Sequence, residues 1–140
     1  RCAEVEPYEI CFADSIGVAV PAQVTELLTQ ARAQLPGMRL RCHFHNTRNT
    51  GIANAWAALE CGVSALDASV GGIGGCPFAP AATGNIASED LLYMLDRSGV
   101  ATGVSLESLI ATTKWLQQQL GRESPGMLHK AGGFPKRALQ

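Results

Sequence analysis

Hydrophobic positions along the chain alternate between the spacing of strands and the spacing of helices. Residues 8–13 form a short apolar and aromatic run that ends in the turn-forming residues 14–17, as expected of a strand. In residues 21–35, apolar side chains such as Val24 and Leu28 recur at helical spacing. The chain is therefore predicted to begin with a strand followed by a helix.

The same alternation continues to residue 120. We predict two more strands, at 38–45 and 64–70, and three more helices, at 53–61, 88–97 and 105–120. Gly62 is expected to cap the first of these helices. Residues 121–140 show no clear periodicity, so we expect a folded part over residues 1–120 and a flexible C-terminal tail over 121–140.

Strands that alternate with helices predict a parallel sheet with crossover connections. Three strands are too few to close a barrel. The order is consistent with about three-eighths of a (β/α)₈ barrel, which needs roughly 250 residues when complete. A small open sheet is the alternative.

Composition narrows the class of protein. Hydrophobic residues make up 46% of the 140 residues and charged residues 16%, which is typical of one globular domain. With 11 basic and 12 acidic residues spread along the chain, nothing favours nucleic-acid binding. No apolar run approaches the roughly 20 residues of a membrane span, so we expect no membrane partner.

The cysteines and the first residue give two further expectations. The chain has 5 cysteines, an odd number, which favours free thiols in a reducing compartment over a set of disulfides. The chain begins with Arg1 instead of Met, so we expect it to be a piece of a longer chain.

The most distinctive chemistry is carried by His43 and His45. Side chains two residues apart on a strand project from the same face, so the two imidazoles are predicted to lie side by side. Taken alone, such a pair is more often structural or zinc-binding, and Cys42 could complete part of a zinc site. A glycine-rich run leading to Cys76, with Asn85 soon after it, adds groups that could hold a metal and do chemistry beside it.

Four segments, in order, carry a resemblance to a known family. They read ADSIG at 13–17, HFHNT at 43–47, GIGGCPFAPAATGN at 72–85 and ASEDLLYML at 87–95. Together they resemble the C-terminal part of the 3-hydroxy-3-methylglutaryl-CoA lyases, metal-dependent enzymes built on a TIM barrel. Related Claisen-type synthases share the HxHN strand but typically lack GGCP, which favours the lyase branch. The implied fold is α/β, the C-terminal portion of a (β/α)₈ TIM barrel.

The resemblance implies a role for each matching residue. His43, His45 and Asn85 match ligands of a divalent cation, Mg²⁺ or Mn²⁺. Cys76 matches the catalytic cysteine on a flexible loop, and Asp14 matches an acidic residue with a supporting, orienting role near the site. The family's remaining protein ligand is an Asp beside an essential Arg on the first strand, outside these 140 residues. The isolated chain is therefore expected to be inactive.

The implied reaction is retro-Claisen cleavage of 3-hydroxy-3-methylglutaryl-CoA to acetyl-CoA and acetoacetate, as in leucine and ketone-body catabolism. The resemblance implies that a metal-site group, with His43 as the candidate, removes the hydroxyl proton, and that Cys76 acts on the proton balance of the acetyl-CoA enolate. The expected partner is an acyl-CoA substrate, and the complete protein is expected to form a homodimer. A bacterial-type cytoplasmic location is expected, with the mitochondrial matrix as the alternative.

Departures from the family leave alternatives open. Many such lyases read HxHDT, whereas this chain has Asn46, Thr47 and Arg48. Arg48 could meet a different substrate carboxylate or the CoA phosphates, so a lyase for a related 3-hydroxyacyl-CoA is one alternative. A Claisen-type synthase relative and a non-catalytic barrel fragment are two others.

Four further residues have structural interpretations. We expect Trp56 and Trp115 in the core and His129 in solvent. Asp67, within the third predicted strand, either supports the metal site from inside a barrel or satisfies backbone groups. The cysteines other than Cys76 are expected to be packing residues.

Overall fold

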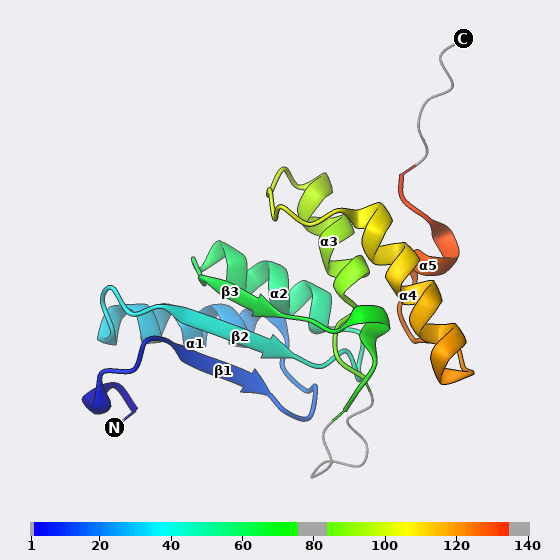
Figure 1. The fold of residues 1–140 in the computed structure, drawn as a ribbon. Coiled ribbons are helices and arrows are strands. Elements are labelled where there is room, and N and C mark those ends of the chain that lie inside the picture. Colours follow the sequence, from blue (N-terminus) through cyan, green and yellow to red (C-terminus); the bar gives the residue numbers. More distant parts are fainter. Residues whose placement is uncertain (1, 76–83, 135–140) are drawn as a thin grey trace.

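The structure is a computed structural model that describes residues 2–75 and 84–134. In chain order its elements are η1 (Cys2–Val5), β1 (Ile10–Asp14), α1 (Pro21–Gln34), β2 (Leu40–Phe44), α2 (Gly51–Glu60), β3 (Ala65–Asp67), η2 (Val70–Gly72), α3 (Ser88–Arg97), α4 (Leu106–Leu120) and α5 (Leu128–Ala131), where η denotes a 3₁₀ helix. Figure 1 shows their arrangement.

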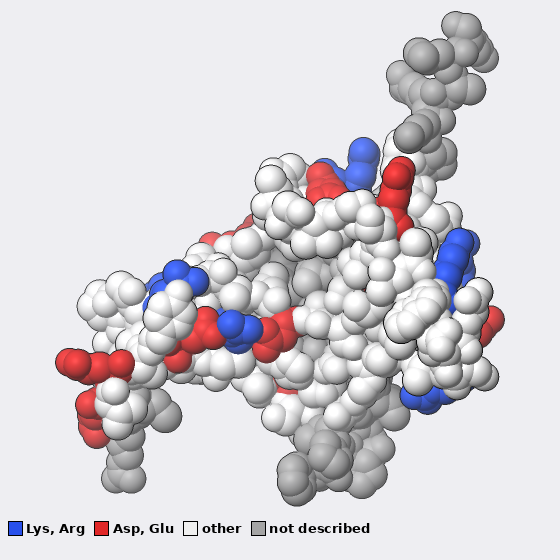
Figure 2. All heavy atoms as spheres, viewed as in Figure 1, with Lys and Arg blue, Asp and Glu red and all other residues white. Residues whose placement is uncertain are grey.

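The three strands form one parallel sheet in the order β1-β2-β3, which confirms the predicted α/β architecture. Helices α1 and α2 lie side by side against one face of the sheet (Figure 1). No element of residues 2–75 or 84–134 covers the opposite face. Acidic and basic side chains alternate along this open face (Figure 2).

The alternation of side chains along β2 explains why one face is covered. Leu40, Cys42 and Phe44 point to the helices and are buried, whereas Arg41 and His43 point to the open face and are partly exposed. The helices and the segments around them complete the same core with Val24, Leu28, Ala31, Ala55, Ala57, Ala58, Val63, Ile86, Leu91 and Leu95.

Helix α2 ends as the sequence predicted, at a glycine. Gly62 has φ of 76°, a left-handed conformation that favours glycine. Its N–H donates to the carbonyl of Leu59 at 2.8 Å, and the N–H of Val63 donates to that of Ala58 at 3.3 Å. These two bonds form the Schellman motif and turn the chain sharply into β3.

The third strand is shorter than predicted. The expected strand at 64–70 is confirmed only for β3, because beyond Asp67 the chain has no ladder partner on β2. Instead, the N–H of Ser69 donates to the carbonyl of Ile86 at 3.0 Å, and the N–H of Ser88 donates to that of Ser69 at 2.8 Å. The chain leaving the sheet therefore pairs with the returning segment, and η2 forms between them.

The C-terminal segment, expected to be a flexible tail, packs against α3 and η2 through residue 134. The carboxylate of Asp90 accepts hydrogen bonds from the N–H groups of Met127 and Leu128, at 2.8 to 3.0 Å. The N–H of Gly126 donates to the carbonyl of Gly71 at 3.0 Å. Helix α5 has only four residues, too few to show a periodic pattern in the sequence.

Three expectations about single side chains were wrong. His129 is only 8% exposed, because its segment packs against the rest of the structure instead of extending into solvent. Trp115 is 57% exposed, on a face of α4 that no other described element covers. Cys11 is exposed on the open face of the sheet instead of packed in the core. None of the helices within residues 2–75 and 84–134 has the length and the apolar composition that a membrane span requires.

We predict that Cys42 resists thiol reagents until the protein unfolds. Burial raises the pKa of its thiol to about 12, so at pH 8 only about 1 in 10⁴ molecules carries the reactive thiolate. Treatment of the complete protein with iodoacetamide, followed by peptide mass spectrometry, is expected to leave Cys42 unlabelled in buffer and labelled in 8 M urea. Rapid labelling in buffer would contradict this burial.

Candidate metal centre

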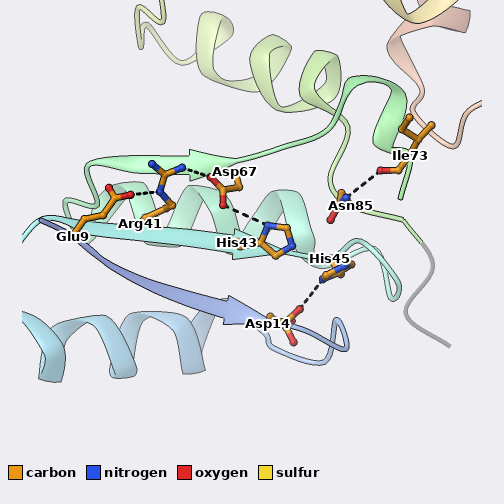
Figure 3. Close-up of polar contacts among 8 residues, drawn as sticks. All are labelled: Glu9, Asp14, Arg41, His43, His45, Asp67, Ile73 and Asn85. Atoms are coloured by element: carbon orange, nitrogen blue, oxygen red, sulfur yellow. Dashed lines mark hydrogen bonds and ion pairs between the residues drawn. The ribbon is translucent and has the colours of Figure 1, made fainter. Parts of the chain in front are cut away.

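The polar side chains singled out in the sequence gather at the carboxyl ends of the strands (Figure 3). His43 lies on β2, His45 directly follows it, Asp14 ends β1 and Asp67 ends β3. The two imidazole rings lie side by side, with their centroids 4.9 Å apart and their planes at 76°. The predicted pairing of the two histidines on one face is thus confirmed.

His45 is oriented by the backbone of the neighbouring strand. The residue is only 4% exposed, and its Nδ1 lies 3.0 Å from the backbone carbonyl oxygen of Asp14. A carbonyl only accepts, so Nδ1 must carry the proton in this contact. Nε2 of His45 then retains its lone pair, which is the usual arrangement of a histidine that binds a metal.

Asp14 supports this arrangement with both its backbone and its side chain. Its carboxylate accepts hydrogen bonds from the N–H groups of Val18 at 3.1 Å and Ala19 at 2.9 Å, which fix the turn after β1. The same turn contains Gly17, where an added Cβ would lie 2.8 Å from the side chain of Thr47. The geometry fits the orienting role expected of Asp14.

Asn85 is brought beside His45 by an isolated antiparallel bridge. Its amide nitrogen donates to the carbonyl of Ile73 at 3.0 Å, whereas its Oδ1 is buried without a hydrogen-bond partner. A Cβ on Gly74 would lie 2.9 Å from that amide nitrogen, so glycine makes room for the side chain. Oδ1 of Asn85, unlike its amide nitrogen, is therefore free to accept a ligand, and the bridge places it beside His45.

The second imidazole, His43, faces a chain of charged groups. Nδ1 of His43 lies 3.6 Å from Oδ2 of Asp67. Oδ1 of Asp67 accepts from Arg41 at 2.7 Å, and Arg41 also donates to Glu9 at 2.6 Å. These two carboxylates raise the pKa of Arg41, which stays positively charged. Asp67 therefore contacts side chains of the candidate site, as one of its two interpretations required.

The sequence did not reveal the part played by Glu9 and Arg41. Their contact depends on the register of β2 between β1 and β3, which places Cys11 opposite Arg41 and Arg41 opposite Ala65. Only the position of Arg41 on the same strand face as His43 could have indicated that it lies near the site.

The residues after the histidines serve the local backbone. Oδ1 of Asn46 accepts from the N–H of Gly51 at 3.1 Å, at the start of α2. A guanidinium nitrogen of exposed Arg48 donates to the carbonyls of Ile16 and Gly17, each at 3.0 Å. The amide nitrogen of Asn46 donates to Oδ1 of Asn49 at 3.4 Å, so an Asp at this position would keep the bond to Gly51 and lose the bond to Asn49. Cys76 lies outside the described residues, and its role stays a prediction.

The donor set fits a hard divalent cation only in part. Imidazole nitrogen and amide oxygen suit Mg²⁺ or Mn²⁺ in a site that also takes water or further oxygen ligands. In residues 2–75 and 84–134, no group of three or more His, Cys, Asp or Glu side chains could hold a metal by itself. Cys42 points to the opposite face of β2 from His43, so a zinc site made of these two residues is excluded.

Comparison with known proteins identifies the family of the chain. A model of the HMGL-like family matches residues 1–116. The chain is 52% identical over 124 residues to (R)-citramalyl-CoA lyase of Chloroflexus aurantiacus, covering 89% of this chain and 39% of that protein. It is 43% identical over 117 residues to hydroxymethylglutaryl-CoA lyase YngG of Bacillus subtilis, covering 84% of this chain and 39% of that protein.

Solved structures show the same fold. The chain superposes on an HMG-CoA lyase from Acinetobacter baumannii, in complex with coenzyme A and 3-methylmalate, with a TM-score of 0.90 and 39% identity. The match covers 96% of this chain and 44% of that one. For the Bacillus subtilis HMG-CoA lyase the TM-score is 0.86 at 39% identity, over 93% of this chain and 44% of that one. The chain thus spans about two fifths of the length of its curated relatives.

Proposed function

Because the chain belongs to the HMGL-like family, we propose that it is the C-terminal part of a divalent-metal-dependent carbon–carbon lyase. The proposed reaction is cleavage of 3-hydroxy-3-methylglutaryl-CoA to acetyl-CoA and acetoacetate. The observation that carries the proposal is the buried, unpaired Oδ1 of Asn85 beside His45, whose Nδ1 is already engaged by a backbone carbonyl.

His43, His45 and Asn85 would hold the cation through Nε2, Nε2 and Oδ1. Mg²⁺ or Mn²⁺ bound there would polarise the C3 hydroxyl and stabilise negative charge on oxygen as the C2–C3 bond breaks. Asp14 keeps the ring of His45 turned so that Nε2 remains free. The other protein ligand comes from the part of the protein outside this chain.

His43 was also the candidate base, and its surroundings limit that role. Its Nδ1 faces Asp67, which leaves Nε2 as the nitrogen for any other partner. One lone pair cannot bind a cation and accept a proton at the same time. We therefore propose ligation as the role of His43, and proton transfer to or from the acetyl-CoA enolate as the role of Cys76.

Citramalyl-CoA is a second candidate substrate, because the chain is 52% identical to (R)-citramalyl-CoA lyase. Both molecules carry a methyl group, a hydroxyl and a carboxylate branch on C3 of an acyl-CoA, and the same C2–C3 bond breaks in each. They differ by one methylene in the branch that bears the carboxylate. A single methylene typically supports discrimination of about 10- to 200-fold, so the substrate has to be measured.

The test uses the complete protein, stripped of metal and then supplied with Mn²⁺ or Mg²⁺. Each acyl-CoA is offered separately, and acetyl-CoA is measured together with acetoacetate from one substrate or pyruvate from the other. We expect cleavage only with added cation and a higher kcat/KM for 3-hydroxy-3-methylglutaryl-CoA. Preference for citramalyl-CoA would change the substrate, and no cation-dependent cleavage of either would refute the lyase proposal.

We predict that Cys76→Ala lowers kcat by about 100-fold or more while the metal still binds. General acid–base groups typically contribute at least this factor, and the change leaves the three proposed ligands in place. The measurement is kcat at saturating Mn²⁺, with Cys61→Ala as the matched control because Cys61 ends α2, away from the strand ends. Full activity in Cys76→Ala would remove this residue from the mechanism.

A further inference from the structure

We propose that Asp67 is a positioning residue, held by Arg41 and Glu9, that sets the ring of His43 for metal binding. The inference rests on the proposed function, because it takes His43 as a ligand. It adds a network of three charged side chains, Glu9, Arg41 and Asp67, of which Asp67 faces His43. Figure 3 shows the network running along the sheet from Glu9 to His43.

The sheet itself brings the four side chains together. His43 on β2 lies opposite Asp67 on β3, and Arg41, two residues earlier on β2, projects from the same face as His43. Arg41 reaches Glu9, just before β1, on one side and Asp67 on the other. The network therefore links β2 and β3 with Glu9, which directly precedes β1, on the sheet face that carries His43 (Figure 3).

The two oxygens of Asp67 have separate partners. Oδ1 accepts from Arg41 at 2.7 Å, and Oδ2 faces Nδ1 of His43 at 3.6 Å. A carboxylate with one oxygen fixed by a guanidinium has lost most of its rotational freedom, so the second oxygen is held toward the imidazole. Arg41 is itself fixed by its second bond, to Glu9 at 2.6 Å. The two bonds of Arg41 thus fix the position of Oδ2 of Asp67 beside the imidazole of His43.

The position of Oδ2 favours one tautomer of the His43 imidazole. At 3.6 Å the contact is longer than a hydrogen bond, so it acts through electrostatic attraction. Negative charge beside Nδ1 favours the tautomer that carries its proton there, and this tautomer leaves the Nε2 lone pair for a cation. His45 obtains the same tautomer from the Asp14 carbonyl at 3.0 Å. One imidazole is thus oriented by backbone and the other by a side chain.

The competing interpretation is purely structural. Arg41 and its two carboxylates could serve only to tie the three strands together. In that case, loss of Asp67 would destabilise the sheet but would leave the tautomer of His43 and the affinity for the cation unchanged. The test therefore needs a readout on the imidazole itself.

The test compares Asp67→Asn with the unaltered complete protein, both metal-free and labelled with ¹⁵N-histidine. Two-dimensional NMR distinguishes Nδ1–H from Nε2–H, with His43→Gln used to assign the signal. We expect His43 to lose its Nδ1–H preference in Asp67→Asn, while His45 keeps its own. We also expect Mn²⁺ affinity, measured by titration calorimetry, to fall about 10- to 100-fold.

Two further variants, Arg41→Met and Glu26→Gln, complete the experiment. Arg41→Met frees the carboxylate without removing it and is expected to shift tautomer and affinity in the same direction by a smaller factor. If Asp67→Asn fails to fold, Arg41→Met alone tests whether the network positions His43. Glu26→Gln, a carboxylate-to-amide change on the exposed surface of α1, is the matched control and should change neither quantity. An unchanged tautomer and unchanged Mn²⁺ affinity in the network variants would overturn the inference.

The outcomes also separate this inference from the proposed function. If the unaltered protein binds no Mn²⁺, the metal-dependent lyase proposal fails, yet the tautomer comparison in metal-free protein still decides whether Asp67 positions His43. If the unaltered protein binds Mn²⁺ and cleaves substrate while Asp67→Asn does the same with equal affinity, only the positioning role is lost.

Discussion

His45→Ala in the complete protein is expected to abolish tight Mn²⁺ binding and to lower kcat/KM by about 1,000-fold or more. A catalytic cation supplies several kcal/mol of transition-state stabilisation, and each 1.36 kcal/mol corresponds to a factor of about ten. His45 is the better oriented of the two imidazoles, since its ring is buried and its Nδ1 is bonded to the carbonyl of Asp14. The substitution therefore removes a proposed ligand whose orientation the fold already fixes.

Activity alone would not distinguish loss of metal from loss of fold. The measurement pairs Mn²⁺ titration calorimetry with circular dichroism, which is expected to show the same secondary structure in both proteins. His129→Ala is the matched control, because His129 is also buried but lies on α5, far along the chain from the strand ends. Mn²⁺ affinity within threefold of the unaltered protein in His45→Ala would show that this residue is no ligand.

The second large effect is expected from Glu89→Ala, which should lower the free energy of unfolding by about 3 kcal/mol. Glu89 is fully buried in the first turn of α3, and its Oε2 accepts from the N–H of Gly71 at 2.9 Å. Alanine would leave that buried N–H unpaired, at a cost of about 1–3 kcal/mol, and would leave a cavity that adds roughly 1–2 kcal/mol.

The surroundings of Glu89 explain why its loss is hard to absorb. A Cβ on Gly126 would lie 2.6 Å from Oε1 of Glu89, so the C-terminal segment passes directly over the carboxyl group. The carbonyl of Gly71 accepts from the N–H of Gly126 at 3.0 Å. Helix α3, the turn η2 and the C-terminal segment therefore meet at this one side chain.

Urea unfolding of the complete protein measures the effect, with two comparison variants. Glu89→Gln keeps an acceptor oxygen and nearly the same volume, and should retain most of the stability that alanine loses. Glu107→Ala removes a carboxyl group from the exposed first turn of α4 and should cost less than about 0.5 kcal/mol. A loss below 1 kcal/mol in Glu89→Ala would contradict the importance of the Gly71 bond.

Elements whose pattern is local were predictable from the sequence. Helix α1 was predicted at 21–35 and found at Pro21–Gln34, because its apolar periodicity and its proline at the first turn are properties of one segment. The length of the third strand was not predictable in this way: a strand was predicted at 64–70 and found at Ala65–Asp67, because its ladder with β2 ends at the pair His43–Asp67. Burial of His129 was missed for a related reason: it depends on Asp90, more than thirty residues earlier, which holds the start of α5.

The candidate site was likewise predictable from the sequence only in part. Alternation along one strand was enough to place His43 and His45 side by side, and the resemblance to the lyases pointed to Asn85. The buried, unpaired state of the Asn85 oxygen could not be read from the sequence, because it depends on a bridge to His45 and a bond to Ile73. The contact of Asp67 with His43 likewise required the register of two strands.

By itself, the sequence of this protein determined the order of its strands and helices, the face of β2 that carries the imidazoles and the family to which the chain belongs. These follow from side-chain periodicity and from residues close together along the chain. Only the tertiary structure decided which carbonyl orients His45, which carboxylate faces His43 and what holds that carboxylate in place. Hydrogen bonds and ion pairs between distant segments depend on ångström-scale register, which no local pattern of residues encodes.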